Sequence, residues 1–172
     1  MRKFRTCICI WVFICSFGRV HGQSEQHKTV YPRITGHIGI VHPLLTVADG
    51  KSTYNFNGSY SVSFVAAINL WKTEKWGFSL ESFPTIKTEN GVSKVTNYTF
   101  HPGVLYRVNP STSLAGRLAF ETSGRFGVTP VFTKIFKKNP FSNYYIAIPM
   151  PIRFGAEKPV SATLAFQVGV SF

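Results

Sequence analysis

The feature that most constrains this chain is the alternation of residue types along its last thirteen positions. Every second residue is apolar, in the order Val160, Ala162, Leu164, Phe166, Val168, Val170 and Phe172. The positions between them hold only Ser, Thr, Ala, Gln and Gly. Because successive side chains of a strand point to opposite faces, this pattern predicts a strand with one oily face and one small or polar face.

The same alternation recurs upstream and predicts eight strands. Their expected ranges are 33–42, 60–71, 75–87, 94–108, 112–122, 125–136, 143–155 and 160–172. Most of these segments have about ten residues or more, the length that a tilted strand needs to cross a bilayer, whereas strands of soluble domains usually have about five or six. Strand length therefore indicates a membrane protein.

Composition agrees with a β protein that has an apolar surface. Only 15% of the residues are charged, against an average of about 25% in soluble domains, and a further 15% are aromatic. After the N-terminal segment, no apolar run approaches the roughly 20 residues of a transmembrane helix, and no long segment has helical periodicity. The sequence therefore excludes a helical membrane protein.

The first 22 residues have the layout of a secretory signal peptide, with basic residues, an apolar stretch at 6–17 and then Gly22 ahead of Gln23. Cleavage near Gly22 divides the chain into a signal peptide (1–22), a short periplasmic segment (23–32) and a barrel domain (33–172). An N-terminal membrane anchor is the alternative, but the apolar stretch is short for roughly 30 Å of hydrocarbon.

All three cysteines, Cys7, Cys9 and Cys15, lie within this leader, so the mature chain has neither a disulfide nor a thiolate metal site. The leader also carries four basic residues and no acidic one, which lowers the net charge from +12 to +8 after cleavage. The remaining charge favours an anionic lipid surface. No basic cluster interleaved with aromatic residues suggests a nucleic-acid partner.

The connections between strands differ in length. Those at 72–74, 109–111 and 137–142 are short and polar, whereas the first, at 43–59, is long and rich in Gly, Asn, Ser and Thr. With an even number of strands, both chain ends and the three short connections share one rim, which we call the terminal rim. The long connection then lies on the opposite rim, the loop rim.

The signal peptide, the eight amphipathic strands, the short turns and the ending Phe166-Gln-Val-Gly-Val-Ser-Phe172 resemble the small outer-membrane β-barrels of Gram-negative bacteria, of the OmpA and OmpX type. The resemblance covers residues 33–172. It implies an eight-stranded antiparallel up-and-down transmembrane barrel in the outer membrane, monomeric and without a cofactor. Its expected partners are outer-membrane lipid and lipopolysaccharide, and the barrel-assembly machinery during insertion.

In that family the assembly machinery reads a terminal aromatic residue preceded by alternating apolar residues. Val168, Val170 and Phe172 match this assembly signal, whereas Gln167 stands where the family often has a glycine. The resemblance also places an aromatic girdle at the terminal rim, for which we expect Trp71, Trp76 and Tyr106.

A closed barrel pairs every backbone N–H and C=O, which hydrocarbon requires, and at eight strands its interior is just wide enough for side chains to fill. The predicted inward face carries the polar residues Glu81, His101, Arg107, Arg117, Glu121 and Arg153, joined by His37, Asn69 and Gln167. We expect Glu81 to pair with Arg117, and Glu121 with Arg153, because buried charges require partners.

These lumen residues predict a plugged barrel with a structural or surface-interaction role. A narrow, porin-like channel for small solutes lined by the same groups is an alternative. A secreted lipocalin-type ligand binder is another, but its oily face would have to point inward. Lys134 is the one charge on the predicted lipid face, near enough to the terminal rim to reach water.

Some barrels of the resembled class are lipid A-modifying enzymes that place a His, a Ser and an acidic residue at the outer rim. His42, Asp49 and Ser52 supply those residue types near the long connection, but they match no recognised motif, so we do not expect an enzyme. His37, His42 and His101 likewise lack the spacing of a metal site, and none is predicted.

Overall fold

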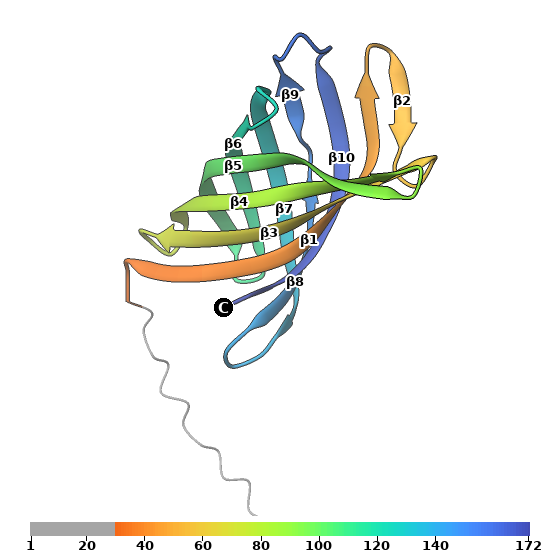
Figure 1. Cartoon of the computed structure of the whole chain (residues 1–172). Helices are drawn as coiled ribbons and strands as arrows, with labels where there is room; N and C mark the ends of the chain where they lie inside the picture. The colour runs from red at the N-terminus through yellow and green to blue at the C-terminus, as the bar shows by residue number, and fades with distance from the viewer. Residues whose placement is uncertain (1–29) are drawn as a thin grey trace, which may run out of the picture.

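The computed structural model describes residues 30–172, which form a single antiparallel sheet (Figure 1). Its strands are β1 (Arg33–Ala48), β2 (Lys51–Tyr54), β3 (Ser59–Trp71), β4 (Trp76–Glu89), β5 (Val92–Asn109), β6 (Thr112–Glu121), β7 (Phe126–Lys138), β8 (Asn143–Pro149), β9 (Ile152–Phe154) and β10 (Ser161–Ser171). Residues 30–172 contain no helix long and apolar enough to cross a membrane. The predicted signal peptide and most of the 23–32 segment lie outside the described residues.

The sheet closes on itself, because β1 pairs with β3 on one side and with β10 on the other. The β1–β10 pairing, which we call the seam, ends at Gly36 and Phe172. Each of these residues donates its backbone N–H to the carbonyl of the other, at 2.8 and 2.9 Å. The ring of Phe172 lies over Gly36 at the position that a β-carbon would occupy. A closed sheet leaves no free edge around the barrel wall.

The strands β8 and β9 are two parts of one strand of the barrel wall, and we call each of the eight wall strands a stave. They are separated at Met150 and Pro151, and Pro149 and Pro151 have no N–H to give to a ladder. Hydrogen bonds continue across the break, since Met150 N donates to Pro130 O and Thr163 N donates to Pro151 O, at 2.9 and 2.8 Å. Counted in this way, and with β2 as a side branch, the structure confirms the predicted eight-stranded antiparallel barrel.

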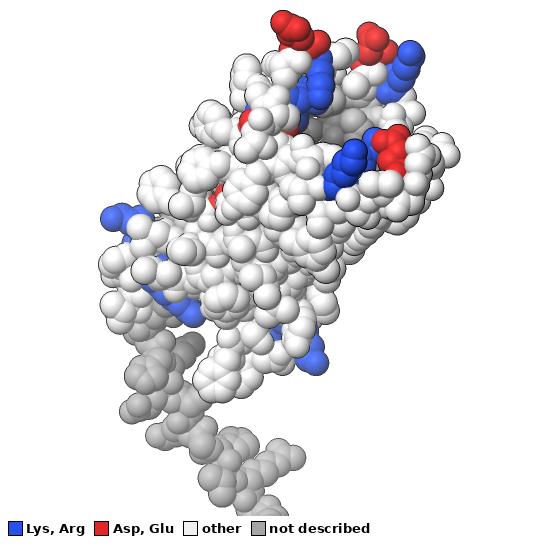
Figure 2. Space-filling view, viewed as in Figure 1, with Lys and Arg blue, Asp and Glu red and all other residues white. Residues whose placement is uncertain are grey.

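The predicted alternation of faces is also observed. Outward residues such as Phe78 and Leu118 are 55% and 53% exposed, whereas their inward neighbours in the chain, Ser79 and Ala119, are 4% and 1% exposed. On the face shown in Figure 2, acidic and basic residues gather toward the two ends and leave a largely uncharged band between them. The oily face therefore points out of the barrel and the polar face into its lumen.

The loop rim differs from the sequence expectation. Residues 43–59 were predicted as a long loop, but β1 continues to Ala48, still paired with β10, and β2 pairs back onto its end in a hairpin at the loop rim (Figure 1). Asp49 and Gly50 form its turn with φ of 51° and 68°. Asp-Gly is a favoured hairpin turn because both residues tolerate positive φ. The alternation fades in this segment because no residue on either face is buried: the end of β1 is partly exposed and β2 is exposed throughout.

The same turn chemistry extends the next hairpin. Asn90 and Gly91 have φ of 51° and 75° and join β4 directly to β5, so that both strands run further than their predicted ranges of 75–87 and 94–108. The short connections at 72–74, 109–111 and 137–142 do lie together on the terminal rim, as antiparallel pairing requires.

Candidate functional site in the barrel lumen

The centre of the lumen is organised around Glu81, which β4 points inward and which is 4% exposed. One carboxylate oxygen lies 2.9 Å from Nδ1 of His101. The other lies 3.1 Å from Nε2 of His37 and 3.4 Å from a guanidinium nitrogen of Arg117. These partners come from β5, β1 and β6, so one carboxylate ties together strands on different sides of the lumen.

Further hydrogen bonds orient the two histidine rings. Asn69 donates its side-chain N–H to Nδ1 of His37 at 3.2 Å, which leaves Nε2–H of that ring to donate to Glu81. Nε2 of His101 lies 3.0 Å from the hydroxyl of Thr129, while its Nδ1 meets Glu81. Both rings can therefore satisfy their partners in a neutral form.

A second ion pair lies closer to the loop rim. Nε of Arg153 donates to Glu121 at 2.6 Å, and a terminal nitrogen of Arg153 donates to Thr129 at 3.0 Å. Since Thr129 also meets His101, the two clusters form one chain of polar contacts. Its order is Asn69, His37, Glu81, His101, Thr129, Arg153, Glu121. We call this chain the lumen network.

The lumen on the terminal side of the network is filled by apolar side chains. Trp71, Leu105, Ala115, Val131, Tyr145 and Ala147 form one buried cluster. The Tyr145 hydroxyl accepts from Gln167 at 2.8 Å, and the rings of Tyr145 and His37 meet edge to face at 5.7 Å. This apolar plug therefore joins directly to the lumen network.

On the loop side, the network forms the floor of a cavity of about 240 Å³. Its walls carry hydroxyl groups and prolines, and its charged lining consists of Glu81, Arg117, Glu121, Arg125 and Arg153. Arg125 spans the mouth, donating to the carbonyls of Arg153 and Pro159 at 3.0 and 2.9 Å. The lumen thus holds an apolar cluster toward the terminal rim and a polar cavity toward the loop rim.

The six predicted lumen residues do not all come together. Glu81, His101, Arg117, Glu121 and Arg153 line one cavity, with Glu81 beside Arg117 and Glu121 beside Arg153. Arg107 is the exception and corrects the prediction. It lies at the terminal rim with its guanidinium 4.0 Å above the Trp71 ring, and it donates to the Glu74 carbonyl and to Tyr31.

Trp71 is a second correction. It is 7% exposed and points into the lumen, where its Nε1 donates to Thr35 at 3.3 Å, so it does not belong to a lipid-facing girdle. The reason is its odd position in β3, which it shares with the inward Val65, Ala67 and Asn69. Trp76 is 53% exposed, and its ring lies 4.7 Å from that of Tyr106, between centroids, at the terminal rim.

The trio His42, Asp49 and Ser52 is not brought together. Asp49 is at the hairpin tip and Ser52 pairs with Val47, while His42 lies further down β1 opposite Phe166. At about 3.3 Å per residue of strand, His42 and Asp49 are on the order of 20 Å apart. His42 instead meets the Tyr60 hydroxyl at 3.0 Å.

Three other predicted positions are at the surface. Lys134 is exposed and donates to the hydroxyls of Ser111 and Thr112, each at 3.2 Å, at the terminal rim. Val168 and Phe172 are 39% and 59% exposed on the outward face of β10, where Val170 is partly buried. Within residues 30–172, no group of three or more His, Cys, Asp and Glu has the arrangement of a metal site.

Sequence reasoning missed Thr129, which links the two halves of the lumen network. Its strand, predicted at 125–136, is the one in which the alternation is least regular, because Pro130 and Lys134 occupy outward positions. The inward parity of Thr129 with Gly127 and Val131 is the signal that was available. The tyrosine at 145 was on the predicted inward face, but its place in an apolar plug depends on packing between strands.

Comparison with known proteins agrees with the fold. No protein-family model and no curated protein sequence matches the chain. Among solved structures, the attachment invasion locus protein Ail of Yersinia pestis is similar, with a TM-score of 0.54 and 14% identity over 83% of this chain and all of the Ail chain. A de novo designed protein, TMB2.3, matches with a TM-score of 0.43 and 10% identity over 82% of this chain and 93% of its own. The chain therefore has the fold expected from its sequence, that of the small eight-stranded antiparallel barrels.

Proposed function

We propose that this protein is an integral outer-membrane β-barrel with a closed lumen, and that it presents the hairpins of its loop rim as a membrane-anchored surface. The observation that carries this proposal is the belt of large apolar side chains on the outside of the barrel. Its members include Ile38, Phe64, Ile68, Phe78, Leu80, Phe100, Leu118, Phe126, Ile148 and Phe166, each between 38% and 62% exposed.

Such a belt is incompatible with a water-soluble surface. The largest apolar patch of a soluble monomer covers only about 300–600 Å², whereas this belt runs around every stave of the barrel. Hydrocarbon solvates these side chains, and the closed ladder satisfies the backbone. The polar lumen also argues against a lipocalin-type binder, whose oily face points inward around its ligand.

The arrangement inside the lumen supports a plug in preference to a channel. A solute that entered the cavity from the loop rim would meet the Glu81 cluster and then the apolar plug around Trp71, Leu105 and Tyr145. Passage would require separating Glu81 from Arg117 within a buried site, which is costly because it strands both charges. We therefore propose a structural or surface-interaction role, with neither transport nor catalysis.

Outer-membrane lipid and lipopolysaccharide are the partners that this placement implies for the belt. The barrel-assembly machinery is the partner that we propose for Val168, Val170 and Phe172 at the end of β10. The exposed side chains of Val168 and Phe172 beside the β1–β10 seam support that role, since a strand recognised before closure must present its outward face.

Gel mobility of the refolded protein in detergent micelles, with and without boiling, tests the membrane barrel. We expect migration that changes on boiling together with a β-type circular dichroism spectrum. Planar-bilayer recordings of the same sample then test the plug, and we expect no stable single-channel current. A β-rich monomer in plain buffer would refute the barrel in the membrane, and steady conductance would refute the closed lumen alone.

A further inference from the structure

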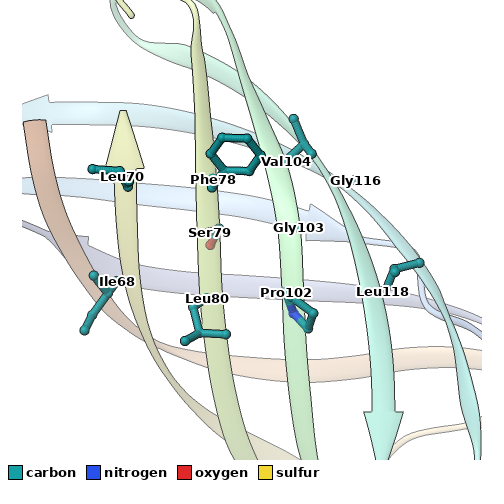
Figure 3. A pocket seen from close by; sticks show the side chains of 10 residues that line it. All are labelled: Ile68, Leu70, Phe78, Ser79, Leu80, Pro102, Gly103, Val104, Gly116 and Leu118. Carbon is teal, nitrogen blue, oxygen red and sulfur yellow. The ribbon is translucent and has the colours of Figure 1, made fainter. Parts of the chain in front are cut away.

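The outer wall of the barrel carries a hollow of about 510 Å³ over β3 to β6, within the apolar belt. Two rows of side chains border it, as Figure 3 shows: Leu70, Phe78 and Val104 nearer the terminal rim, and Ile68, Leu80, Pro102 and Leu118 deeper in the belt. The strand register sets this arrangement, because Leu70 pairs with Phe78 and Phe78 with Val104.

The hollow exists because one outward position in the first row has no side chain. Gly116 is the partner of Val104 across β5 and β6, and a β-carbon built on Gly116 meets no atom within 4 Å. The neighbouring outward residues on β6 are Leu114 and Leu118, so a groove is left between bulky walls. The groove is almost wholly apolar in its lining residues, apart from Ser79.

Basic residues stand at the terminal rim, beyond the end of the groove. The β3–β4 turn carries the exposed Lys72 and Lys75 beside one acidic residue, Glu74. On the other flank, Lys134 extends over the end of β6 through its bonds to Ser111 and Thr112. The rim beyond the groove is therefore aromatic and cationic, and its Trp76 is 53% exposed.

We infer that this groove is a binding site for one anionic glycerophospholipid, with an acyl chain along Gly116 and the phosphate at Lys72 and Lys75. The inference rests on the proposed membrane location. From Trp76 to Leu80 the strand rises about 13 Å along its own axis, or about 10 Å along the membrane normal at a tilt of about 40°, against the roughly 12 Å that one leaflet contributes to an apolar band about 25 Å tall. The groove thus has the depth of a single leaflet.

A second copy of this chain fits the same surface less well. Two barrels that met through this wall in one membrane would bring two β3–β4 turns together, each with Lys72 and Lys75 against a single Glu74. Like charges at a contact oppose association, whereas each lysine near an anionic headgroup contributes about fivefold in affinity. Charge complementarity therefore selects a lipid phosphate.

Trp76 provides the readout. The sequence has three tryptophans, at 11, 71 and 76, and Trp71 is only 7% exposed and faces the lumen. In a Trp11→Phe background, fluorescence quenching by dibrominated lipid in phosphatidylcholine vesicles therefore reports lipid beside Trp76. We expect a small fraction of dibrominated phosphatidylglycerol to quench about tenfold more effectively than dibrominated phosphatidylcholine.

Two variants separate the parts of the site, each with a matched control. Gly116 has no positive φ and a β-carbon there meets no atom within 4 Å, so Gly116→Leu should fill the groove and remove the excess quenching, whereas Ala162→Leu adds similar bulk on the outward face of β10 and should not. The double variant Lys72→Gln/Lys75→Gln should remove the preference for phosphatidylglycerol. Lys87→Gln/Lys94→Gln, on the loop rim, should retain it.

Equal quenching by the two lipids in the parent protein would overturn the site, as would unchanged excess quenching in Gly116→Leu. Cross-linking between copies that Gly116→Leu abolishes, without any lipid preference, would assign the groove to a second copy and overturn the lipid site. Every sample is first tested for heat-modifiable migration. A parent protein that lacks it would refute the membrane location itself, whereas a folded barrel with equal quenching refutes only this lipid site.

Discussion

The terminal and loop halves of this barrel are built from the same strands but solve different problems. In the terminal half the strands join through short turns, and the lumen is filled by apolar side chains around Leu105 and Tyr145. In the loop half two hairpins extend beyond the wall, and the lumen holds a cavity lined by hydroxyl and charged groups. Glu81 lies at the boundary between the two halves.

The difference teaches which interactions inside the lumen stabilise the barrel. An apolar plug is stabilised by burial alone, so apolar substitutions that keep the side-chain volume are tolerated best there. A buried carboxylate is stable only with its complete set of partners, because each partner that is removed leaves another charge or donor without compensation. The boundary at Glu81 should therefore be the most sensitive point of the barrel, and the loop-rim hairpins the least sensitive.

The largest effect is expected at that boundary. Replacing Glu81 by Ala leaves Arg117 and two histidines without their shared acceptor and should lower the free energy of unfolding by about 3–5 kcal/mol. Urea unfolding of the protein in vesicles measures it. Glu89→Gln is the control, because Glu89 pairs with Lys87 at the exposed loop rim and should change stability by less than about 1 kcal/mol. Equal losses in the two variants would contradict the special place of Glu81.

A smaller effect is expected within the apolar plug. Leu105 is 6% exposed, and Leu105→Ala should cost about 3 kcal/mol through lost burial and the cavity left behind. Its neighbour Val104 points outward and is 43% exposed. Val104→Ala removes only part of an apolar contact with lipid, and it should lower the free energy of unfolding by about 1 kcal/mol. The same urea experiment compares them, and a larger loss for the outward position would reverse the assigned faces.

The ion pair nearer the mouth should matter less than the boundary. Glu121→Gln keeps the shape of the side chain but weakens its 2.6 Å contact with Arg153, which can still reach Thr129 and water in the cavity. We expect a loss of about 2 kcal/mol. Unfolding in vesicles at matched protein concentration checks this value. A loss as large as that of Glu81→Ala would show that the cavity is as closed as the plug.

The smallest effect is expected on the loop rim. Removing Val47, Ala48, Lys51 and Ser52 shortens the hairpin by two residue pairs and takes the last two residues of β1 from its ladder with β10, but it keeps the Asp49-Gly50 turn. None of the four residues is buried, so the free energy of unfolding should change by about 1 kcal/mol or less. Boiled and unboiled gel samples should migrate as they do for the parent protein. Loss of the fast-migrating form would show that the hairpin supports barrel closure.

The two halves also differ in how far the sequence predicts them. Alternation predicts the wall, its eight staves and the face of each lumen charge, because one oily and one polar environment act on every residue between the rims. It also predicts the pairing of Glu81 with Arg117, because both residues face inward at about the middle of their predicted strands. Above the wall both faces meet water, so alternation fades, and only the Asp49-Gly50 and Asn90-Gly91 turns carried a signal for the hairpins.

Errors within the wall arose where one residue type suits two environments. Tryptophan serves both in a membrane girdle and in a packed lumen, and the parity of Trp71 within β3 decides for the lumen. Arginine likewise serves in a buried pair or at a rim. Arg107 is close enough to the chain end of β5 to cap the apolar plug instead of joining Glu81. Position along the strand, as well as face, therefore decides the role.

The most direct test of the membrane barrel is a cysteine scan along β6, from Leu114 to Glu121. All three native cysteines lie at positions 7, 9 and 15, so they can be replaced without touching the barrel wall. With a spin label at each position in vesicles, we predict oxygen-accessible, lipid-exposed labels at 114, 116, 118 and 120, and protected labels between them. Access of a water-soluble relaxation agent to the labels at all four of the positions 114, 116, 118 and 120 would contradict a membrane barrel.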